Sequence, residues 1–168
     1  DCAFGKTATN KDVYERTGKV LIDGVLNGRN GTVFAYGATG SGKTQTMVGV
    51  ENDPGMMLLS RADIFDTARR HGDAYVYDVS CSYLEVYNEL IYDLLGGDSR
   101  DHDDVPNKPS LELRDDPERG AVVAGLKRVK VADGDDVMEL LRQGNARRKT
   151  EPTEANATSS RSHAVLEI

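Results

Sequence analysis

The chain has 168 residues, of which 38% are hydrophobic and 29% charged, and its formal net charge is −7. This length fits one domain with a buried core, and the composition excludes a chain that is disordered throughout. The acidic balance argues against a general binder of nucleic acid or anionic membranes, which needs a basic face. No stretch approaches the roughly 18 consecutive apolar residues of a membrane span. Cys2 and Cys81 are too few for a disulfide framework, and we interpret them as reduced thiols of a cytosolic protein.

The first part of the chain predicts helices around one buried strand. Apolar residues at helical spacing predict a single helix over Asp12–Asn27, with Asp12 as its N-cap and Gly28 at its end. The β-branched and aromatic run Thr32–Tyr36 predicts a buried strand. The other predicted helices are a short one at Lys43–Met47 and a longer one at Leu58–Arg70.

The second part of the chain is richer in strand signals. Ala74–Tyr87 alternates and carries many β-branched and aromatic residues, and Leu90–Leu95 continues its apolar character. Gly96–Pro109 is acidic and contains many strand-breaking residues, which predicts a surface loop. The remaining predicted elements are strands at 111–113 and 121–123 around a turn at 117–120, a helix at Asp133–Arg148, a polar loop at Thr150–Ser162 and a strand at Val165–Ile168. Together these elements favour an α/β fold.

Residues 37–44 match the phosphate-loop pattern G-x-x-x-x-G-K-[ST] in full. Glycines let the backbone approach a phosphate, and amides at the start of the following helix point at the anion. Lys43 supplies a cation to the β- and γ-phosphates, and Thr44 supplies a hydroxyl to Mg²⁺. A flexible glycine turn is the alternative, but a predicted strand before the loop and a helix after it favour nucleotide binding. The predicted phosphate-binding residues are Gly37, Ala38, Thr39, Gly40, Ser41, Gly42, Lys43 and Thr44.

A second polar motif, Asn-Ala-Thr-Ser-Ser-Arg-Ser-His, occupies residues 156–163 just before the final predicted strand. Taken alone, it is either an ordinary serine-rich turn or a loop that offers hydroxyls to an anion or a metal. The phosphate loop does not choose among small-molecule kinases, GTPases, helicases and motors, so the second motif decides between them.

The two motifs together resemble those of the kinesin motor domain. In that family the phosphate loop stands in a Phe-Ala-Tyr-Gly-x-Thr-Gly-Ser-Gly-Lys-Thr frame, which residues 34–44 reproduce, and the first switch has the Asn-x-x-Ser-Ser-Arg-Ser-His pattern of 156–163. Phrases such as Tyr83–Glu89 agree, and the resemblance covers essentially the whole chain. Ala38 and Pro54–Met57 are most similar to the eighth kinesin subfamily, whose motors walk to microtubule plus ends and regulate microtubule length.

The resemblance implies a phosphate-loop NTPase fold with a central mixed β-sheet flanked by helices. It implies a motor that binds ATP and Mg²⁺, hydrolyses ATP and moves on microtubules of the cytoplasmic cytoskeleton, with no nucleic-acid or membrane partner. The neck and coiled coil of the family are not in the sequence, so a dimer follows only from the resemblance.

The resemblance also assigns roles to single residues. Thr44 and Ser160 would hold Mg²⁺. Ser159 would lie near the attacking water, Asn156 would contact the γ-phosphate side, and Arg161 would form the salt bridge that joins the two switches. The first switch would thus sense the γ-phosphate.

Several departures from the family pattern limit what this chain can do. Gln45 stands where many kinesins place an aromatic residue or histidine against the adenine, so we expect weaker base stacking. The adenine-contacting Arg-x-Arg-Pro segment, the second switch Asp-Leu-Ala-Gly-Ser-Glu and most of the microtubule face are absent. Residues 1–168 are therefore expected to be a partial motor domain, truncated at both ends, with little ATPase activity by itself.

Some assignments stay open at the level of sequence. Lys127, Arg128 and Lys130 are candidates for tubulin contact, although a solvated strand edge explains them as well. Basic residues at the end of the helix 133–148 either tether the first switch or only cap the helix. Another phosphate-loop NTPase, or a non-catalytic microtubule-binding or nucleotide-sensing module, is the alternative to a motor.

Overall fold

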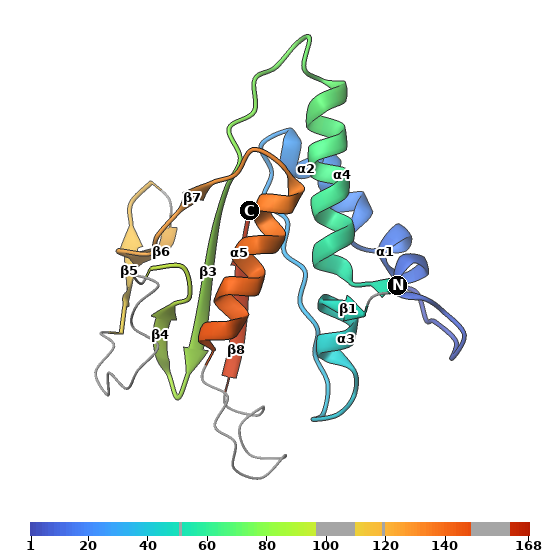
Figure 1. Cartoon of the computed structure of the whole chain (residues 1–168), viewed down its shortest axis with the longest axis horizontal. Helices are drawn as coiled ribbons and strands as arrows, with labels where there is room; N and C mark the ends of the chain where they lie inside the picture. Colours follow the sequence, from blue (N-terminus) through green and yellow to red (C-terminus); the bar gives the residue numbers. More distant parts are fainter. Residues whose placement is uncertain (51, 97–109, 119, 149–161) are drawn as a thin grey trace. The chain divides into compact units, whose positions relative to one another are not determined.

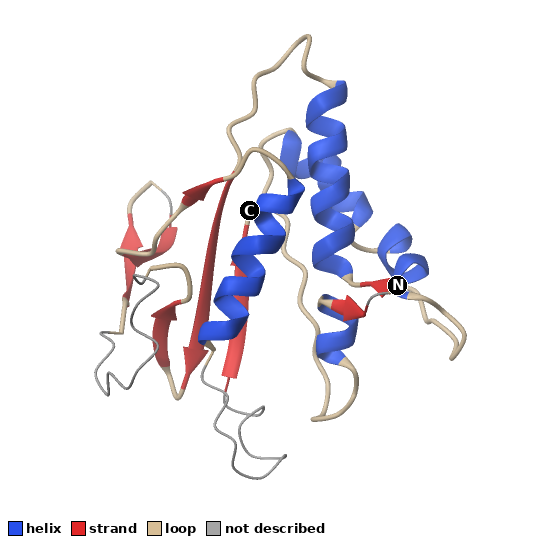
Figure 2. Ribbon diagram, viewed as in Figure 1, coloured by secondary structure: helices blue, strands red, loops and turns tan. Residues whose placement is uncertain are grey.

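The computed structural model describes residues 1–50, 52–96, 110–118, 120–148 and 162–168. The chain divides into two compact units, Asp1–Tyr77 and Asp78–Ile168 (Figure 1). The first unit is mainly helical and the second contains a sheet with one helix (Figure 2). Helices and strands together confirm the predicted α/β class.

The first unit contains four helices and one short ladder within its described residues. Its core is formed by the side chains that α1, α2 and α4 turn toward one another, namely those of Tyr14, Ile22, Met56 and Ile64. The Tyr14 hydroxyl donates to Asp63 Oδ2 at 2.7 Å, and burial raises the pKa of Tyr14. The elements are α1 (Asn10–Arg16), α2 (Lys19–Leu26), α3 (Lys43–Met47), β1 (Gly49–Val50), β2 (Asp53–Pro54) and α4 (Met56–Arg70).

The single helix predicted over Asp12–Asn27 is wrong, because the chain forms two helices with a break at Thr17 and Gly18. A β-branched residue followed by glycine is a weak helix-forming pair. A Cβ at Gly18 would lie 2.9 Å from Cδ2 of Tyr14, so the break also lets the Tyr14 ring pack against the backbone. The predicted end at Gly28 is confirmed by its φ of 82°.

The start of this helical region also differs from the prediction. Thr9 is the N-cap of α1, and Asp12 is the third helical residue of a capping box. The Asp12 carboxylate accepts from the Thr9 backbone N–H at 2.9 Å, while the Thr9 hydroxyl accepts from the Asp12 N–H at 3.2 Å. This hydrogen bond from the Thr9 backbone lowers the pKa of Asp12.

The strand predicted over Thr32–Tyr36 is wrong as well, because these residues have no regular secondary structure. Phe34 is 80% exposed and Tyr36 is 96% exposed, so the segment is not buried. An extended apolar run becomes a stable strand only when another strand pairs with it. Among the described residues no strand pairs with this segment.

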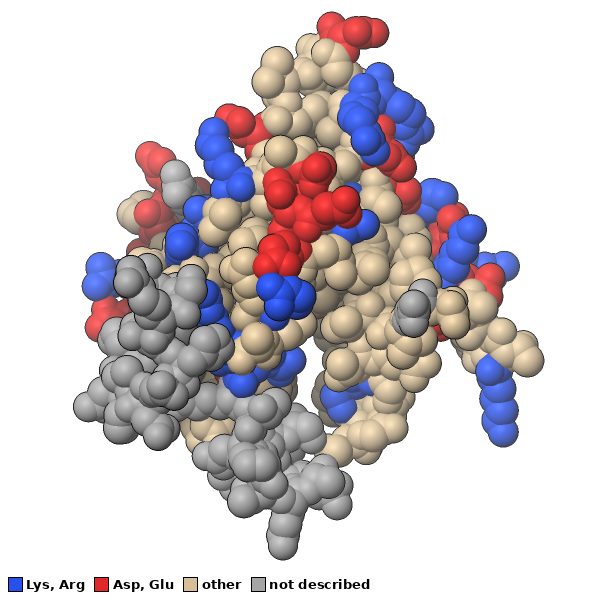
Figure 3. Space-filling model, in the orientation of Figure 1, with Lys and Arg blue, Asp and Glu red and all other residues tan. Residues whose placement is uncertain are grey.

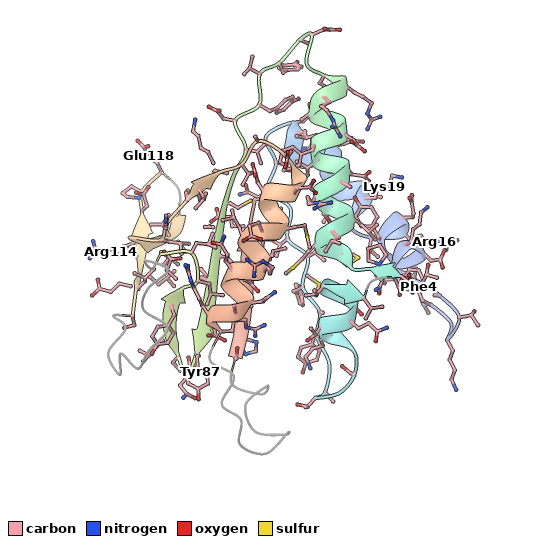
Figure 4. All side chains as sticks on the ribbon, in the orientation of Figure 1. Phe4, Arg16, Lys19, Tyr87, Arg114 and Glu118 are labelled. Carbon is pink, nitrogen blue, oxygen red and sulfur yellow. The ribbon has the colours of Figure 1, made fainter. Side chains whose placement is uncertain are left out.

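The second unit is built on strand β3 (Ser80–Tyr87). It pairs antiparallel with β4 (Leu90–Asp93) on one side and with β8 (Ser162–Glu167) on the other. The short strand β7 (Val129–Lys130) pairs with the start of β3. Tyr87 lies at the end of β3 (Figure 4).

Two further parts of the second unit match the predicted elements. Helix α5 (Gly134–Arg147) begins after Asp133, whose side chain accepts from the N–H groups of Asp135 and Asp136. Strands β5 (Glu112–Asp116) and β6 (Gly120–Ala124) form the predicted hairpin. Figure 3 shows acidic side chains over the start of α5, where they complement the positive end of the helix dipole.

The core of the second unit lies between α5 and one face of the sheet. Gly144 lets the helix approach β3 closely, since a Cβ there would lie 2.3 Å from Cδ1 of Tyr83. The Tyr83 hydroxyl donates to Asn145 Oδ1 at 2.8 Å, which fixes the ring under the last turn of α5. The core residues of this unit are Cys81, Tyr83, Leu94, Leu95, Val131, Val137 and Leu141.

Other predictions have mixed outcomes. The strand predicted over Ala74–Tyr87 begins only at Ser80, and Val76 is 98% exposed. The predicted loop Gly96–Pro109 lies outside the described residues except for Gly96. The last predicted strand is confirmed as β8, which starts three residues earlier than expected. In the described ranges, none of the helices has the length and apolar character that crossing a membrane requires.

Alanine at two helical glycines is expected to have opposite effects on stability. Gly144→Ala should lower the free energy of unfolding by about 1–3 kcal/mol, because the methyl group collides with the Tyr83 ring. Gly24→Ala in α2 should raise it by roughly 0.5–1 kcal/mol, since a Cβ there meets nothing closer than 3.9 Å. Urea unfolding of both variants beside the wild type measures the difference. Equal effects of the two substitutions would contradict the packing described for α5.

The two cysteines are expected to react at very different rates. Cys81 is 0% exposed and burial raises the pKa of its thiol to about 11, whereas Cys2 is exposed. Iodoacetamide at pH 8 should therefore alkylate Cys2 within minutes and leave Cys81 unmodified until the second unit unfolds. Peptide mapping by mass spectrometry measures both sites, with a urea-unfolded sample as control. Rapid native labelling of Cys81 would contradict its burial.

Candidate functional site

The phosphate loop 37–44 leads directly into helix α3 of the first unit. Gly40 and Gly42 have φ angles of 81° and 90°, in the left-handed region that side chains rarely adopt. Between them, Ser41 N–H donates to the Ala38 carbonyl at 3.1 Å and closes a turn. The helix predicted at Lys43–Met47 is confirmed with the same bounds. The backbone of the loop therefore has the conformation for which its glycines are required.

The Lys43 ammonium bridges the two ends of this loop. Its Nζ donates to the carbonyl oxygens of Gly37 and Ala38, each at 2.8 Å. A flexible cation is thus held over the loop by neutral acceptors. Anionic phosphate oxygens form stronger, charge-assisted bonds than carbonyls do, so a polyphosphate at the loop can draw this ammonium to itself.

Thr44 and Gln45 are both exposed on α3. The Thr44 carbonyl accepts from Val48 N–H at 2.8 Å, and that of Gly42 accepts from Thr46 N–H at 2.9 Å, so the backbone of this short helix is satisfied internally. The Gln45 side chain offers an amide rather than a ring for contact with a base.

Asn10 supports this helix and was not among the residues predicted from the sequence. It is 8% exposed, and its Nδ2 donates to the Gln45 carbonyl at 3.1 Å and to the Asp53 carbonyl at 3.2 Å. Its backbone N–H donates to Asp53 Oδ1 at 3.0 Å. Asn10 therefore ties α1 to both α3 and β2. A local pattern cannot reveal this role, because the partners lie 35 and 43 residues along the chain.

The second predicted part of the site lies almost wholly outside the described residues. The predicted residues Asn156, Ser159, Ser160 and Arg161 are among those that the structure does not describe. Ser162 and His163, the last residues of the motif, form the start of β8, where they pair with Tyr87 and Val86 of β3. The phosphate loop belongs to the first unit and β8 to the second.

A polar cluster in the second unit surrounds the buried side chain of Glu85. The Ser162 hydroxyl donates to Glu85 Oε1 at 2.5 Å, and Arg148 Nε lies 3.3 Å from the same oxygen. Arg148 Nη2 also donates to Ser162 Oγ at 3.0 Å. Next to it, Arg147 Nη1 donates to the Leu94 carbonyl at 2.9 Å. Sequence patterns predicted β3 but gave no signal that one of its residues holds this cluster.

The first unit also contains a hollow of about 480 Å³ at the end of α4. The His71 ring and the Tyr77 hydroxyl are 3.3 Å apart in its wall. No residue of the phosphate loop lines it. The chemistry of the predicted site is therefore carried by the loop and not by this hollow.

Comparisons with known proteins agree with these features. A family model described as the kinesin motor domain matches residues 1–168. Kinesin-like protein KIN-8B of Arabidopsis thaliana is 56% identical over all of this chain, which covers 19% of that protein. Human kinesin-like protein KIF19 is 46% identical over all of this chain, which covers 16% of it. The chain thus spans less than a fifth of the length of these two relatives.

A solved structure has the same fold. It is a KIF14 dimer in a two-heads-bound state, with AMP-PNP and in complex with a microtubule. Its TM-score with this chain is 0.84 at 35% sequence identity, over 99% of this chain and 45% of the other. Because the family model matches the whole chain and the fold agrees, the chain belongs to the kinesin motor domain family.

Proposed function

We propose that the protein containing this chain is a microtubule motor ATPase, which couples binding and hydrolysis of MgATP to movement along microtubules. The observation that carries the proposal is the phosphate loop with Lys43 held across it, in a chain that the kinesin motor family model matches from end to end. Residues 1–168 would form part of the motor domain, and the protein would act on the microtubules of the cytoplasm. The likeness to KIN-8B and to the KIN-8A protein of rice supports a motor of the eighth subfamily.

The geometry of the loop fits a nucleoside polyphosphate. Ideal Cβ positions at Gly40 and Gly42 have no atom within 4 Å, so the backbone is open to a ligand on that side. Lys43 is the cation at the loop, and the residues predicted for phosphate contact, 37–44, are contiguous. Because Gln45 provides no ring for stacking, affinity for the nucleotide would come mainly from its phosphates.

The hydroxyl groups of Thr44 and Ser160 also suit Mg²⁺, which prefers oxygen ligands and retains several waters. Thr44 would supply one hydroxyl and Ser160 a second. When bound, the ion would neutralise charge on the β- and γ-phosphates. Residues Asn156, Ser159 and Arg161 would act on the γ-phosphate side, with Ser159 beside the attacking water and Arg161 joining the two switches.

The basic residues considered for tubulin contact give little support to microtubule binding by this part of the chain. Two of the three basic residues considered for tubulin contact already have acidic partners: Arg128 pairs with Glu167 at 2.5 Å and Lys130 with Asp78 at 3.3 Å. Both pairs are exposed and individually weak. Their surroundings favour the solvated strand edge over a tubulin-binding patch, so the main microtubule contacts of the motor would lie elsewhere in the protein.

Removal of the Lys43 ammonium should weaken nucleotide binding at the loop and abolish stimulated turnover. In the full-length protein, Lys43→Ala should weaken MgATP binding by about 10- to 100-fold, the effect of one lost charge-assisted bond, and reduce microtubule-stimulated turnover to background. Lys19→Ala is the matched control, since the ion pair of Lys19 among the described residues is an exposed one with Glu15 at 2.7 Å. A fluorescent ATP analogue and a phosphate-release assay measure both quantities. Unchanged binding and turnover in Lys43→Ala would exclude a motor ATPase that uses this loop.

The Thr44 hydroxyl should be required for use of Mg²⁺. Thr44→Val keeps the shape of the side chain but removes the oxygen, and it should lower turnover at least about tenfold, because Mg²⁺ loses a protein ligand. Thr44→Ser keeps the hydroxyl and should stay within about threefold of the wild type. Turnover of the full-length protein as a function of MgCl₂ concentration separates the two variants. If valine and serine behaved alike, Thr44 would not be a ligand.

A further inference from the structure

A single buried carboxylate joins the residues on either side of segment 149–161. Glu85 is 2% exposed, and its Oε1 receives both the Ser162 hydroxyl, at 2.5 Å, and the Arg148 guanidinium, at 3.3 Å. Arg148 and Ser162 also contact each other at 3.0 Å. The three side chains therefore form a closed triangle of polar contacts, in which Glu85 is the most buried member. We call Glu85, Arg148 and Ser162 the Glu85 cluster.

The three residues of the Glu85 cluster come from three different secondary-structure elements. Glu85 lies in β3, where it stands opposite Tyr92 of β4 and Ala164 of β8, so its backbone is fixed on both sides. Arg148 is the C-cap residue of α5, and Ser162 is the first residue of β8. These three elements thus bring together the end of α5 and the start of β8.

A buried carboxylate at position 85 contributes little to the stability of the fold. Burying a charge requires desolvation, and a buried ion pair is seldom more stabilising than apolar side chains of the same volume. Cys81 and Tyr83, at alternate positions before Glu85 in β3, are core residues. An apolar residue at position 85 would thus suit the core. Unlike an apolar side chain, the carboxylate accepts directional hydrogen bonds from Arg148 and Ser162 and so fixes their positions.

We propose that Glu85 is a positioning residue for ATP hydrolysis, which acts by holding the two ends of segment 149–161 in one fixed arrangement. The proposal rests on the proposed function, since that segment carries Asn156, Ser159, Ser160 and Arg161. Fixing the ends of a segment reduces the conformations open to the residues within it. Misplacement of reacting groups by about 1 Å can cost on the order of 100-fold in rate. Fixed positions for the residues that flank this segment therefore matter more for catalysis than for binding of ADP.

A second group on the same two strands provides a matched control. Ser82 Oγ donates to Glu167 Oε2 at 2.8 Å, and Arg128 pairs with the same carboxylate. This group also consists of serine, glutamate and arginine, but it lies at the other ends of β3 and β8 and does not touch Arg148 or Ser162. Glu167 is half exposed whereas Glu85 is buried, so Glu167→Gln controls for loss of a serine- and arginine-bonded carboxylate on this strand pair but not for loss of a buried one. It leaves the contacts of Arg148 and Ser162 unchanged.

The decisive experiment compares Glu85→Gln with Glu167→Gln in the full-length protein. Glu85→Gln should lower kcat for ATP at least about tenfold, with KM and the affinity for ADP changed less than about threefold. Glu167→Gln should leave all three values within about twofold of the wild type. With Mg²⁺ and AMP-PNP present, amide hydrogen exchange in 149–161 should be at least about tenfold faster in Glu85→Gln than in the wild type.

A second variant guards against a general folding defect. Ser162→Ala removes one hydrogen bond of the cluster and no charge, and it should lower kcat about three- to tenfold with the melting temperature within a few degrees of the wild type. The double variant Glu85→Gln and Ser162→Ala should be less impaired than the product of the two single effects, because both act on one cluster.

The outcomes separate the inference from the proposed function. A wild-type protein that hydrolyses no ATP with microtubules would overturn the proposed function. An active wild type with kcat unchanged in Glu85→Gln, or with kcat and ADP affinity reduced in parallel, would overturn the positioning role alone. Equal hydrogen exchange of 149–161 in wild type and Glu85→Gln would overturn it as well, whatever the activity.

Discussion

The close packing of α5 on β3 is the interaction on which the second unit depends. Gly144 leaves room for the Tyr83 ring, which lies against the helix and hydrogen-bonds to Asn145. This contact sets how far the end of α5 stands from the strand. Arg148, one turn beyond Gly144, can consequently reach Glu85 two residues beyond Tyr83. A wider residue than glycine at 144 would move the helix away, and the polar cluster at its end would separate with it.

The elements predicted correctly are those that nearby residues in the sequence determine. Helix α5 has its cap in Asp133 and its apolar residues at helical spacing, and hairpin β5–β6 has a turn between short strands. The errors arise where packing or strand pairing, rather than sequence periodicity, determines the structure. Tyr14 packs against Gly18 and thereby breaks a helix that periodicity alone predicts as continuous. Residues 32–36 have the composition of a strand, but composition cannot supply the partner that a strand requires.

The same distinction applies to the candidate site. The phosphate loop could be predicted because eight consecutive residues contain its glycines, its cation and its hydroxyl, and its conformation has the left-handed angles that these glycines permit. The roles of Asn10 and Glu85 could not be predicted, because each depends on partners far along the chain. Asn10 looks like an ordinary first-turn residue. Strand alternation places Glu85 on the same face as Cys81 and Tyr83, but it does not show which groups would bond to a carboxylate there. Only the fold shows that both are buried and bonded.

The pairing of β3 with β8 has a consequence for how the chain folds. The ladder from Ser82–Glu167 to Tyr87–Ser162 joins residues up to 85 positions apart, whereas β3–β4 and β5–β6 are local hairpins. Local hairpins form within microseconds, but long-range pairing must first close a large loop. During synthesis, one edge of β3 stays unpaired until β8 leaves the ribosome, so the nascent second unit exposes a strand edge that is prone to association with other chains.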